Sequence, residues 1–449
     1  MIKKVIPCID IKDGKAVKGV NFEDVKEVGS ILELAVKYAQ AGADELFLLD
    51  ISGAIDHESS QRSWVKEVIK AVDIPLTIGG GITTVEDAAY LLGLGISKVS
   101  IGSAALNNPD FLKQLTTQFG SEAIVSSIDA KKVDGQWMVF SGGGQQKTGK
   151  ELMAWAKEVE RLGVGSILFT SIDHDGSQAG YAVEALAKLK EAVSIPIIAS
   201  GGAGKLSHFV EACNLGKADA VLAASLFHFD IIEVAQLKFA LRAAGVEVDL
   251  ASSFKNLTWD SNGMIPAIIQ DVDTDLVLML GYMTEESLSK TLETGKVTFY
   301  SRSRQKLWTK GEESGNFLNL MEMRVDCDRD ALLVKAKPQG PTCHLGSATC
   351  WRENKVDKNF LFSLESLLKE RVKSSPEESY TASLFAAGKE KMAQKVGEEA
   401  VELVIEALGN NNTLFLNEAA DLMYHYLVLL LGRGFSLADV IYILEKRRH

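Results

Sequence analysis

Eight short apolar segments, each followed by a stretch with helical periodicity, constrain the fold of residues 1–245 more than any other feature. Each segment is apolar along its length, which is typical of strands in a parallel sheet buried on both faces. Eight such strand–helix units match the typical size of a closed (β/α)8 barrel. The predicted strands are residues 4–10, 45–50, 74–80, 98–103, 123–129, 166–172, 195–202 and 220–225.

The predicted barrel repeats internally. Asp10 ends the first strand and Asp129 ends the fifth, an offset of 119 residues. GGGITTVEDA begins at residue 79 and SGGAGKLSHF at residue 200, an offset of 121, and Ser103 corresponds to Ser225 at an offset of 122. A shared period of this kind indicates two half-barrels of four units each.

The pattern changes twice after the barrel. Residues 261–352 contain short strands and one helix at TEESLSKTLET, and the residues from 360 onward place apolar side chains at i, i+3 and i+4. We therefore predict a multidomain chain. It comprises a (β/α)8 TIM barrel at 1–250, a linker at 251–260, a small mostly β (α+β) domain at 261–355 and an all-α helical domain at 360–449.

Charge and cysteine content narrow the function classes. A formal net charge of −12 argues against binding nucleic acid or an anionic membrane, whereas phosphorylated small molecules remain compatible with local backbone amides. The start MIKKVIPCID lacks the apolar core of a signal peptide. The sequence has no uninterrupted apolar stretch of about 18 residues, so we predict no membrane-spanning helix. Five cysteines, an odd count, fit a reducing compartment, so we expect a cytoplasmic protein.

Two aspartates stand where barrel enzymes place their chemistry, at the carboxyl ends of strands. Asp10 and Asp129 are half a barrel apart, so they are expected to face each other across the mouth. Two opposed carboxylates can divide the roles of acid and base. The alternative is that each aspartate only caps a loop or the following helix.

Paired glycine-rich turns indicate two phosphate sites. Residues 79–81 and 200–202 end the third and seventh strands, and residues 101–103 and 223–225 end the fourth and eighth. Glycine lets backbone amides approach an anion, and the next helix start favours negative charge. Packing at strand–helix junctions explains any one of these turns but not their pairing, which predicts a long substrate with a phosphate at each end.

The segments IPCIDIKDGKAVKG, SIDAKKVDG, TSIDHDGSQAG and ASGGAGK resemble the cyclase subunit of imidazole glycerol phosphate synthase across residues 1–250. The resemblance implies that phosphoribulosyl formimino carboxamide ribotide reacts with ammonia to give imidazole glycerol phosphate and aminoimidazole carboxamide ribotide. It implies Asp10 and Asp129 as the catalytic pair. It also implies one phosphate at Gly81, Gly102 and Ser103 and the other at Asp175, Gly176, Gly202, Ala224 and Ser225.

The ammonia for this reaction requires a source. Neither Cys8, within a strand, nor Cys213, within a helix, stands on the strand–helix elbow of a glutaminase nucleophile, so we expect a separate glutaminase subunit as partner. The resemblance implies that ammonia enters from the opposite barrel face past a charged gate at Lys4, Glu45 and Lys98. The fourth gate position, usually Glu, is Ser166 here.

The segments VDCDRD and GPTCHLGSATCW predict two metal sites. Cys327, Cys343 and Cys350 supply three thiolates, which leave one zinc position open for water. On an extended segment Asp326, Asp328 and Asp330 would share one face, and three carboxylates suit Mg²⁺. The alternative is a solvated acidic turn. His344 reads equally well as a base or as a packed residue.

IPAIIQD, TFYSRSRQKLWTKGEESG and the cysteine pattern resemble phosphoribosyl-AMP cyclohydrolase, which opens the adenine ring hydrolytically with zinc. The resemblance implies a zinc site shared between two subunits, so that Cys327 meets Cys343 and Cys350 of a partner chain in a homodimer. It makes Arg302, Arg304 and Lys310 candidate phosphate contacts.

Two predicted helices carry acids at helical spacing. KVGEEAVELVIEA holds Glu398, Glu399 and Glu402, and NEAADLMYHYLVLL holds Glu418 and Asp421. Like charges stacked on a helix repel, so a shared Mg²⁺ is one reason to keep them, and a solvated acidic stripe is the alternative. The pattern resembles phosphoribosyl-ATP pyrophosphohydrolase, which releases pyrophosphate with Mg²⁺.

Together these resemblances predict a trifunctional enzyme of histidine biosynthesis, with one lyase and two hydrolase activities on phosphoribosyl substrates. Two other interpretations stay open. The barrel could be the sister isomerase, which shares fold and substrate, or a scaffold for the catalytic second half of the chain.

Overall fold

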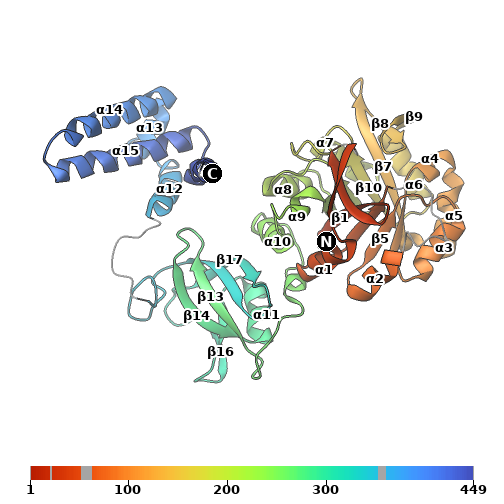
Figure 1. The fold of residues 1–449 in the computed structure, drawn as a ribbon, viewed down its shortest axis with the longest axis horizontal. Coiled ribbons are helices and arrows are strands. Elements are labelled where there is room, and N and C mark those ends of the chain that lie inside the picture. Colours follow the sequence, from red (N-terminus) through yellow and green to blue (C-terminus); the bar gives the residue numbers. More distant parts are fainter. Residues whose placement is uncertain (1, 21–22, 52–62, 352–359, 448–449) are drawn as a thin grey trace. The chain divides into compact units, whose positions relative to one another are not determined.

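The computed structural model describes residues 2–20, 23–51, 63–351 and 360–447. By its contacts the chain divides into two compact units, one containing the barrel and the other the C-terminal helices. Figure 1 shows the barrel strands with helices around them. It also shows a smaller region of strands, coloured green to cyan, and a helical region, coloured blue.

The predicted barrel is confirmed. Within the described residues, eight parallel strands pair in the order β10-β11-β12-β1-β4-β5-β6-β7, and a β10–β7 pairing closes the ring. The strands are β1 (Lys4–Lys12), β4 (Leu46–Asp50), β5 (Leu76–Gly79), β6 (Lys98–Ile101), β7 (Ile124–Val133), β10 (Ser166–Ser171), β11 (Ile197–Ser200) and β12 (Ala220–Ala223).

Helices cover the outside of the ring, so the strands are buried on both sides as their apolar runs predict. A small inner core that includes Ile6, Phe47 and Leu168 fills the barrel, and a larger outer core lies between strands and helices. The outer helices are α1 (Ile31–Gln40), α2 (Ser63–Ala71), α3 (Val85–Gly93), α5 (Pro109–Phe119), α6 (Leu152–Arg161), α7 (Val183–Ala192), α8 (Leu206–Asn214) and α10 (Val234–Ala243).

Two hairpins that the sequence analysis did not predict extend the barrel at corresponding places in its two halves. β2 (Lys15–Val20) and β3 (Glu23–Gly29) continue antiparallel from β1, and β8 (Gln136–Ser141) and β9 (Gln146–Glu151) continue from β7. Two short helices, α4 (Ser103–Asn107) and α9 (Ser225–His228), follow β6 and β12. The internal repeat is therefore present in the fold as well as in the sequence.

A buried lysine fixes the segment after the barrel to the barrel's N-terminal face. Lys238 in α10 is fully buried, and its Nζ lies 2.6 Å from Asp44 Oδ1 and 2.8 Å from Ser252 Oγ. Ser252 in turn donates to the carbonyl of Gly42. The first residues of the predicted linker thus form a packed 3-10 turn at Ala251–Phe254.

Residues after the linker form a four-stranded sheet in the order β14-β13-β18-β17 and a two-stranded β15-β16 hairpin. These elements are β13 (Ile265–Asp271), β14 (Val277–Met283), α11 (Glu285–Thr294), β15 (Thr298–Ser301), β16 (Lys306–Thr309), β17 (Leu318–Val325) and β18 (Leu332–Pro338). This mixed composition confirms the predicted α+β class.

The C-terminal region is helical, as predicted, and packs around a small core that includes Leu368, Met392 and Leu427. By length and composition α15 passes the test for a membrane-crossing helix, a test that core helices of soluble proteins also pass. The helices are α12 (Phe360–Arg371), α13 (Tyr380–Ala387), α14 (Lys389–Ala407), α15 (Asn412–Gly432) and α16 (Leu437–Lys446).

Candidate functional site

The two strand-end aspartates stand on opposite sides of the barrel. Around the ring of eight, β7 is the fourth strand from β1 in either direction, so Asp10 and Asp129 are half a turn apart. Asp10 is buried, and the Cys8 thiol donates to its Oδ1 at 3.6 Å. Two carboxylates are thereby presented at the same, C-terminal rim.

The environment of Asp129 favours its protonated form. Desolvation by the surrounding barrel wall and the nearby Asp175 charge, opposed by a hydrogen bond with Thr170, together raise the pKa of Asp129 to about 6. Part of the side chain is still open at the mouth. A carboxyl with this pKa can exchange a proton with a bound molecule near neutral pH.

The first glycine turn is shaped for backbone exposure. Gly80 has φ +93, and a Cβ there would lie 1.8 Å from the Asp50 carbonyl oxygen, so only glycine fits. Gly81 also has positive φ, and Gly102 precedes α4. The Ser103 hydroxyl accepts a hydrogen bond at 2.9 Å from the Gly142 amide in the β8–β9 turn.

The second glycine turn repeats this geometry. A Cβ at Gly202 would lie 2.0 Å from the Gly180 carbonyl oxygen, and the Gly180 amide donates to the Gly202 carbonyl at 2.8 Å. Gly176 has positive φ, and Ala224 precedes α9, which begins at Ser225. The residues predicted for two phosphates therefore lie on equivalent turns of the two half-barrels.

The opposite face of the barrel holds the predicted gate. Glu45 is 1% exposed, and its carboxylate lies 2.7 Å from Lys98 Nζ and 3.6 Å from Lys4 Nζ. The Thr77 hydroxyl donates to the same carboxylate. Ser166, at the fourth position, is buried and uncharged. The residues predicted to form the gate thus comprise one carboxylate held between two ammonium groups.

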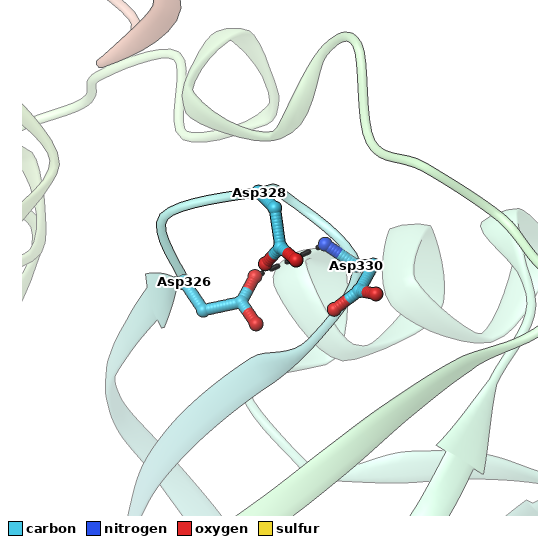
Figure 2. Close-up of side chains that lie close together, drawn as sticks. All are labelled: Asp326, Asp328 and Asp330. Atoms are coloured by element: carbon cyan, nitrogen blue, oxygen red, sulfur yellow. Dashed lines mark hydrogen bonds between the residues drawn. The ribbon is translucent and has the colours of Figure 1, made fainter.

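Three carboxylates gather on the turn between β17 and β18 (Figure 2). Oxygens of Asp326, Asp328 and Asp330 lie within 4.8 Å of one another, and all three residues are exposed. The charges of Asp328 and Asp326, together with desolvation, raise the pKa of Asp330. Crowded oxygen donors whose repulsion a cation would relieve fit Mg²⁺.

The prediction that the three aspartates lie on one face of an extended segment was wrong. Residues 326–330 form a tight turn rather than an extended segment with alternating faces. The Asp326 carboxylate accepts from the amides of Asp330 and Ala331, both at 3.0 Å, and Arg329 adopts φ +63. These contacts curl the chain and bring the three carboxylates together.

Two of the three predicted zinc ligands lie close together. Desolvation and the neighbouring Cys343 raise the pKa of the Cys350 thiol. Lys310 is buried beside both sulfurs, and burial lowers its pKa while the two cysteines oppose that effect. His344 is exposed, with Nδ1 4.0 Å from Cys343 Sγ. A thiol pair beside an ammonium group can hold a soft metal.

The other predicted residues of this domain have different surroundings. Cys327 is exposed on the β17–β18 turn and belongs to neither group of converging ligand atoms found in the described residues. Arg302 stacks on the Tyr282 ring at 3.9 Å, and Arg304 is exposed on the β15–β16 turn. Lys310, predicted to contact phosphate, stands instead next to the thiols.

The helical region contains the second converging group. Glu399 and Glu402 of α14 and Glu418 of α15 place carboxylate oxygens within 4.8 Å of one another. Desolvation, Glu402 and Asp421 raise the pKa of Glu418. These carboxylates face each other between two packed helices. This arrangement favours a divalent-cation site over the alternative of a solvated acidic stripe.

Three neighbouring residues refine this predicted set. Glu398 is turned outward and pairs with Lys395 at 2.8 Å, so it lies outside the converging group. Lys395 also reaches Glu399 at 2.9 Å. His425, which the sequence analysis did not select, is buried with Nε2 3.7 Å from Glu399. Its position seven residues after Glu418, on the same helix face, was the available signal.

Three family models match the chain in order. The histidine biosynthesis protein model matches residues 4–233, the phosphoribosyl-AMP cyclohydrolase model residues 279–352, and the phosphoribosyl-ATP pyrophosphohydrolase model residues 361–448. The first match contains both strand-end aspartates and both glycine turns. The second contains the three cysteines and the aspartate turn, and the third contains the facing carboxylates.

Curated relatives match the barrel over nearly their whole length. The imidazole glycerol phosphate synthase subunit HisF of Flavobacterium johnsoniae is 52% identical over 250 residues, 56% of this chain and 100% of the relative. The same subunit of Elusimicrobium minutum is 48% identical, covering 55% of this chain and 99% of the relative. That of Pyrobaculum aerophilum is 49% identical, covering 55% and 97%.

Proposed function

The chain belongs to the histidine biosynthesis protein family, and from this premise we propose how its residues divide three reactions. The enzyme is trifunctional, with a cyclase in the barrel, a phosphoribosyl-AMP cyclohydrolase in the middle and a phosphoribosyl-ATP pyrophosphohydrolase at the C-terminus. The cyclase is a lyase and the other two are hydrolases. The assignments of individual residues below are our proposals.

In the barrel, phosphoribulosyl formimino carboxamide ribotide binds with one phosphate on each glycine turn and its reacting centre between Asp10 and Asp129. Asp129 serves as the acid, because its raised pKa of about 6 keeps it protonated in part near neutral pH. Asp10 serves as the base that removes a proton as the imidazole ring closes. The single observation that carries this proposal is two acids half a barrel apart between equivalent turns.

One assay separates this proposal from its alternatives. The full chain is incubated with the bisphosphate substrate and an ammonium salt, and imidazole glycerol phosphate is measured. We expect product, and a loss of about 100-fold or more in Asp129→Asn. If the barrel were the isomerase or only a scaffold, no ammonia-dependent imidazole glycerol phosphate would form even in the wild-type chain.

Ammonia is supplied by a separate glutaminase subunit on the barrel's N-terminal face and passes Glu45, Lys98 and Lys4. The match to relatives that are named as synthase subunits supports such a partner. Glutamine should support product formation only when a glutaminase is added, whereas ammonium salt should support it without one. Glutamine-dependent turnover by the chain alone would contradict the proposal. We place the enzyme in the cytoplasm.

In the cyclohydrolase, Cys343 and Cys350 of one subunit hold zinc together with Cys327 of a second copy, and Asp326, Asp328 and Asp330 hold Mg²⁺. Zinc, when bound, supplies a water of lowered pKa. Lys310 offsets the negative charge of the thiolates, and the exposed His344 is placed to move a proton at the substrate ring. Arg302 and Arg304 bind the substrate phosphate.

Subunit complementation tests the shared zinc site. Cys327→Ser and Cys343→Ser should each abolish ring opening of phosphoribosyl-AMP. Because an isologous dimer places residues of both chains in each site, mixing and refolding the two variants should restore about a quarter of wild-type activity. No recovery, with the dimer still present by light scattering, would refute a site shared between chains.

In the helical region, Glu399, Glu402 and Glu418, with Asp421 beside them, hold Mg²⁺, and Lys395 neutralises phosphate charge as pyrophosphate leaves. The facing carboxylates of α14 and α15 support this assignment. Purified chain given phosphoribosyl-ATP and Mg²⁺ should release pyrophosphate, and adding Zn²⁺ should then give the ring-opened product. Absence of pyrophosphate at saturating Mg²⁺ would contradict it.

A further inference from the structure

The two half-barrels hold their glycine turns with different side chains at equivalent positions. Asp87 in α3 and His208 in α8 are 121 residues apart, the same offset that relates the GGG and SGG turns. Both side chains point back to the turn that precedes their helix, and both are buried, with 4% and 7% exposed. The equivalence makes their chemical difference informative.

In the first half a carboxylate organises the turn. Asp87 Oδ2 accepts from the amides of Thr83 at 2.8 Å and Thr84 at 2.9 Å. Thr84 also caps α3, since its hydroxyl accepts from the Asp87 amide. This reciprocal capping box holds the residues that follow Gly81.

In the second half an imidazole takes over this task. The amide of Gly204, equivalent to Thr83, donates to His208 Nδ1 at 3.1 Å. Because the backbone amide is the donor, Nδ1 of His208 is the acceptor in this hydrogen bond. Among the described residues, the Lys205 side chain at the helix cap makes no capping hydrogen bond. His208 is therefore the side chain that accepts from this turn.

The hydrogen bond from Gly204 to His208 lies where two chain segments of the second turn meet. Residues 201–204 contact both His208 and the 174–180 segment, where the Gly180 amide donates to the Gly202 carbonyl. The His208 ring also lies next to Gly180, with Cδ2 3.6 Å from the position a Cβ would take. The His208 imidazole thus contacts both chain segments that form the second turn, residues 201–204 and 174–180.

We propose that His208 is a positioning residue that holds the second glycine turn in its phosphate-binding conformation. The inference rests on the proposed role of Gly202, Ala224 and Ser225 in binding phosphate. His208 acts through the backbone. Without its Nδ1 acceptor the Gly204 amide loses its hydrogen-bond partner, and the turn samples conformations in which its amides no longer converge.

Two variants separate the hydrogen bond from ring packing. His208→Leu fills much of the space but cannot accept, whereas His208→Asn places an amide oxygen near the position of Nδ1. Ser194→Ala is the matched control, because it removes one hydrogen bond, to Glu160, before β11 begins and away from the C-terminal rim. The readouts are kcat and KM for the bisphosphate substrate with ammonium salt, and the affinity of the full chain for inorganic phosphate.

For His208→Leu we expect KM and the phosphate dissociation constant to rise about five- to tenfold, the effect of losing one hydrogen bond, with kcat within about twofold. His208→Asn should restore KM to within about threefold, and Ser194→Ala should change neither constant. An unchanged KM in His208→Leu, or Asn no better than Leu, would overturn the proposal. A wild-type chain that makes no ammonia-dependent product would instead refute the proposed function.

Should His208→Leu fail to fold, hydrogen exchange of residues 201–206 in the wild-type chain decides the question. Inorganic phosphate should slow exchange of the Gly204 amide, because a bound anion favours the conformation that His208 holds. Exchange that is unaffected by saturating phosphate would overturn the inference.

Discussion

Replacing Asp129 by Asn should stabilise the barrel while it removes cyclase activity. Desolvation raises the pKa of Asp129 from an ordinary 3.8 to about 6. A shift of about two units corresponds to about 3 kcal/mol of differential stability between the charged and neutral forms. Because the side chain is partly open at the barrel mouth, solvent screening reduces this figure, and we expect about 1–3 kcal/mol.

The sign of the effect depends on pH. A carboxyl whose folded-state pKa is raised binds more protons in the folded state than in the unfolded state between pH 4 and 6. Its stabilising contribution is fully present below pH 4 and is lost as the pH rises through 6. Asn stays neutral throughout, so Asp129→Asn and the wild type should have equal stability near pH 4. The variant should be more stable by the full amount near pH 8.

Hydrogen exchange followed by mass spectrometry measures this difference in a chain of several domains, because peptides from β7 report the opening free energy of the barrel alone. Asp134→Asn is the control, since Asp134 is exposed on the β7–β8 turn and Asn tolerates its positive φ. The cyclase rate of Asp129→Asn should fall about 10²–10⁴-fold. A variant that is less stable at pH 8, or a stability difference independent of pH, would refute the reasoning.

Three further outcomes follow from buried or converging groups. Lys238→Met should destabilise the barrel by about 3–5 kcal/mol in thermal unfolding, because it leaves the Asp44 carboxylate without its buried partner. Cys343→Ser should remove one zinc per chain by elemental analysis and abolish ring opening, while pyrophosphate release continues. Glu399→Gln should raise the Mg²⁺ concentration for half-maximal pyrophosphate release about tenfold, whereas the outward-facing Glu398→Gln should change it less than twofold.

The barrel could be predicted because its strands are buried on both faces, which leaves a continuous apolar run in the sequence. The hairpins β2–β3 and β8–β9 could not be predicted in the same way. QKTGKE in β9 is polar and lacks the apolar run of a buried strand, and β2 and β8 pair antiparallel with the ends of β1 and β7 that run on beyond the barrel rim. Edge pairing of this kind depends on tertiary context rather than on local propensity.

Some of the candidate site residues could likewise be predicted from the sequence, and others depend on tertiary packing. Strand order alone places Asp10 and Asp129 at one rim, since parallel strands in a barrel end together. On helices, spacing restricts candidates to a face but does not choose between adjacent residues. Glu398 and Glu399 both pair with Lys395, and only the packing of α14 against α15 brings Glu399 to the carboxylate of Glu418. His425 stands in an apolar run, where a histidine is more often a packed core residue than part of a site.

The order of the reactions limits what the fusion of the three activities can do. The C-terminal helices produce phosphoribosyl-AMP, which the cyclohydrolase consumes, so these two steps can gain from a raised local concentration. The ring-opened product still carries a phosphoribosyl group, whereas the proposed barrel substrate carries a phosphoribulosyl group, so an aldose–ketose isomerisation must come between the two. An intermediate that has to visit an isomerase before it reaches the barrel cannot pass through a closed channel joining all three sites. Direct transfer of an intermediate is therefore open only to the last two activities of the chain, and the barrel depends instead on the proposed glutaminase subunit for its ammonia.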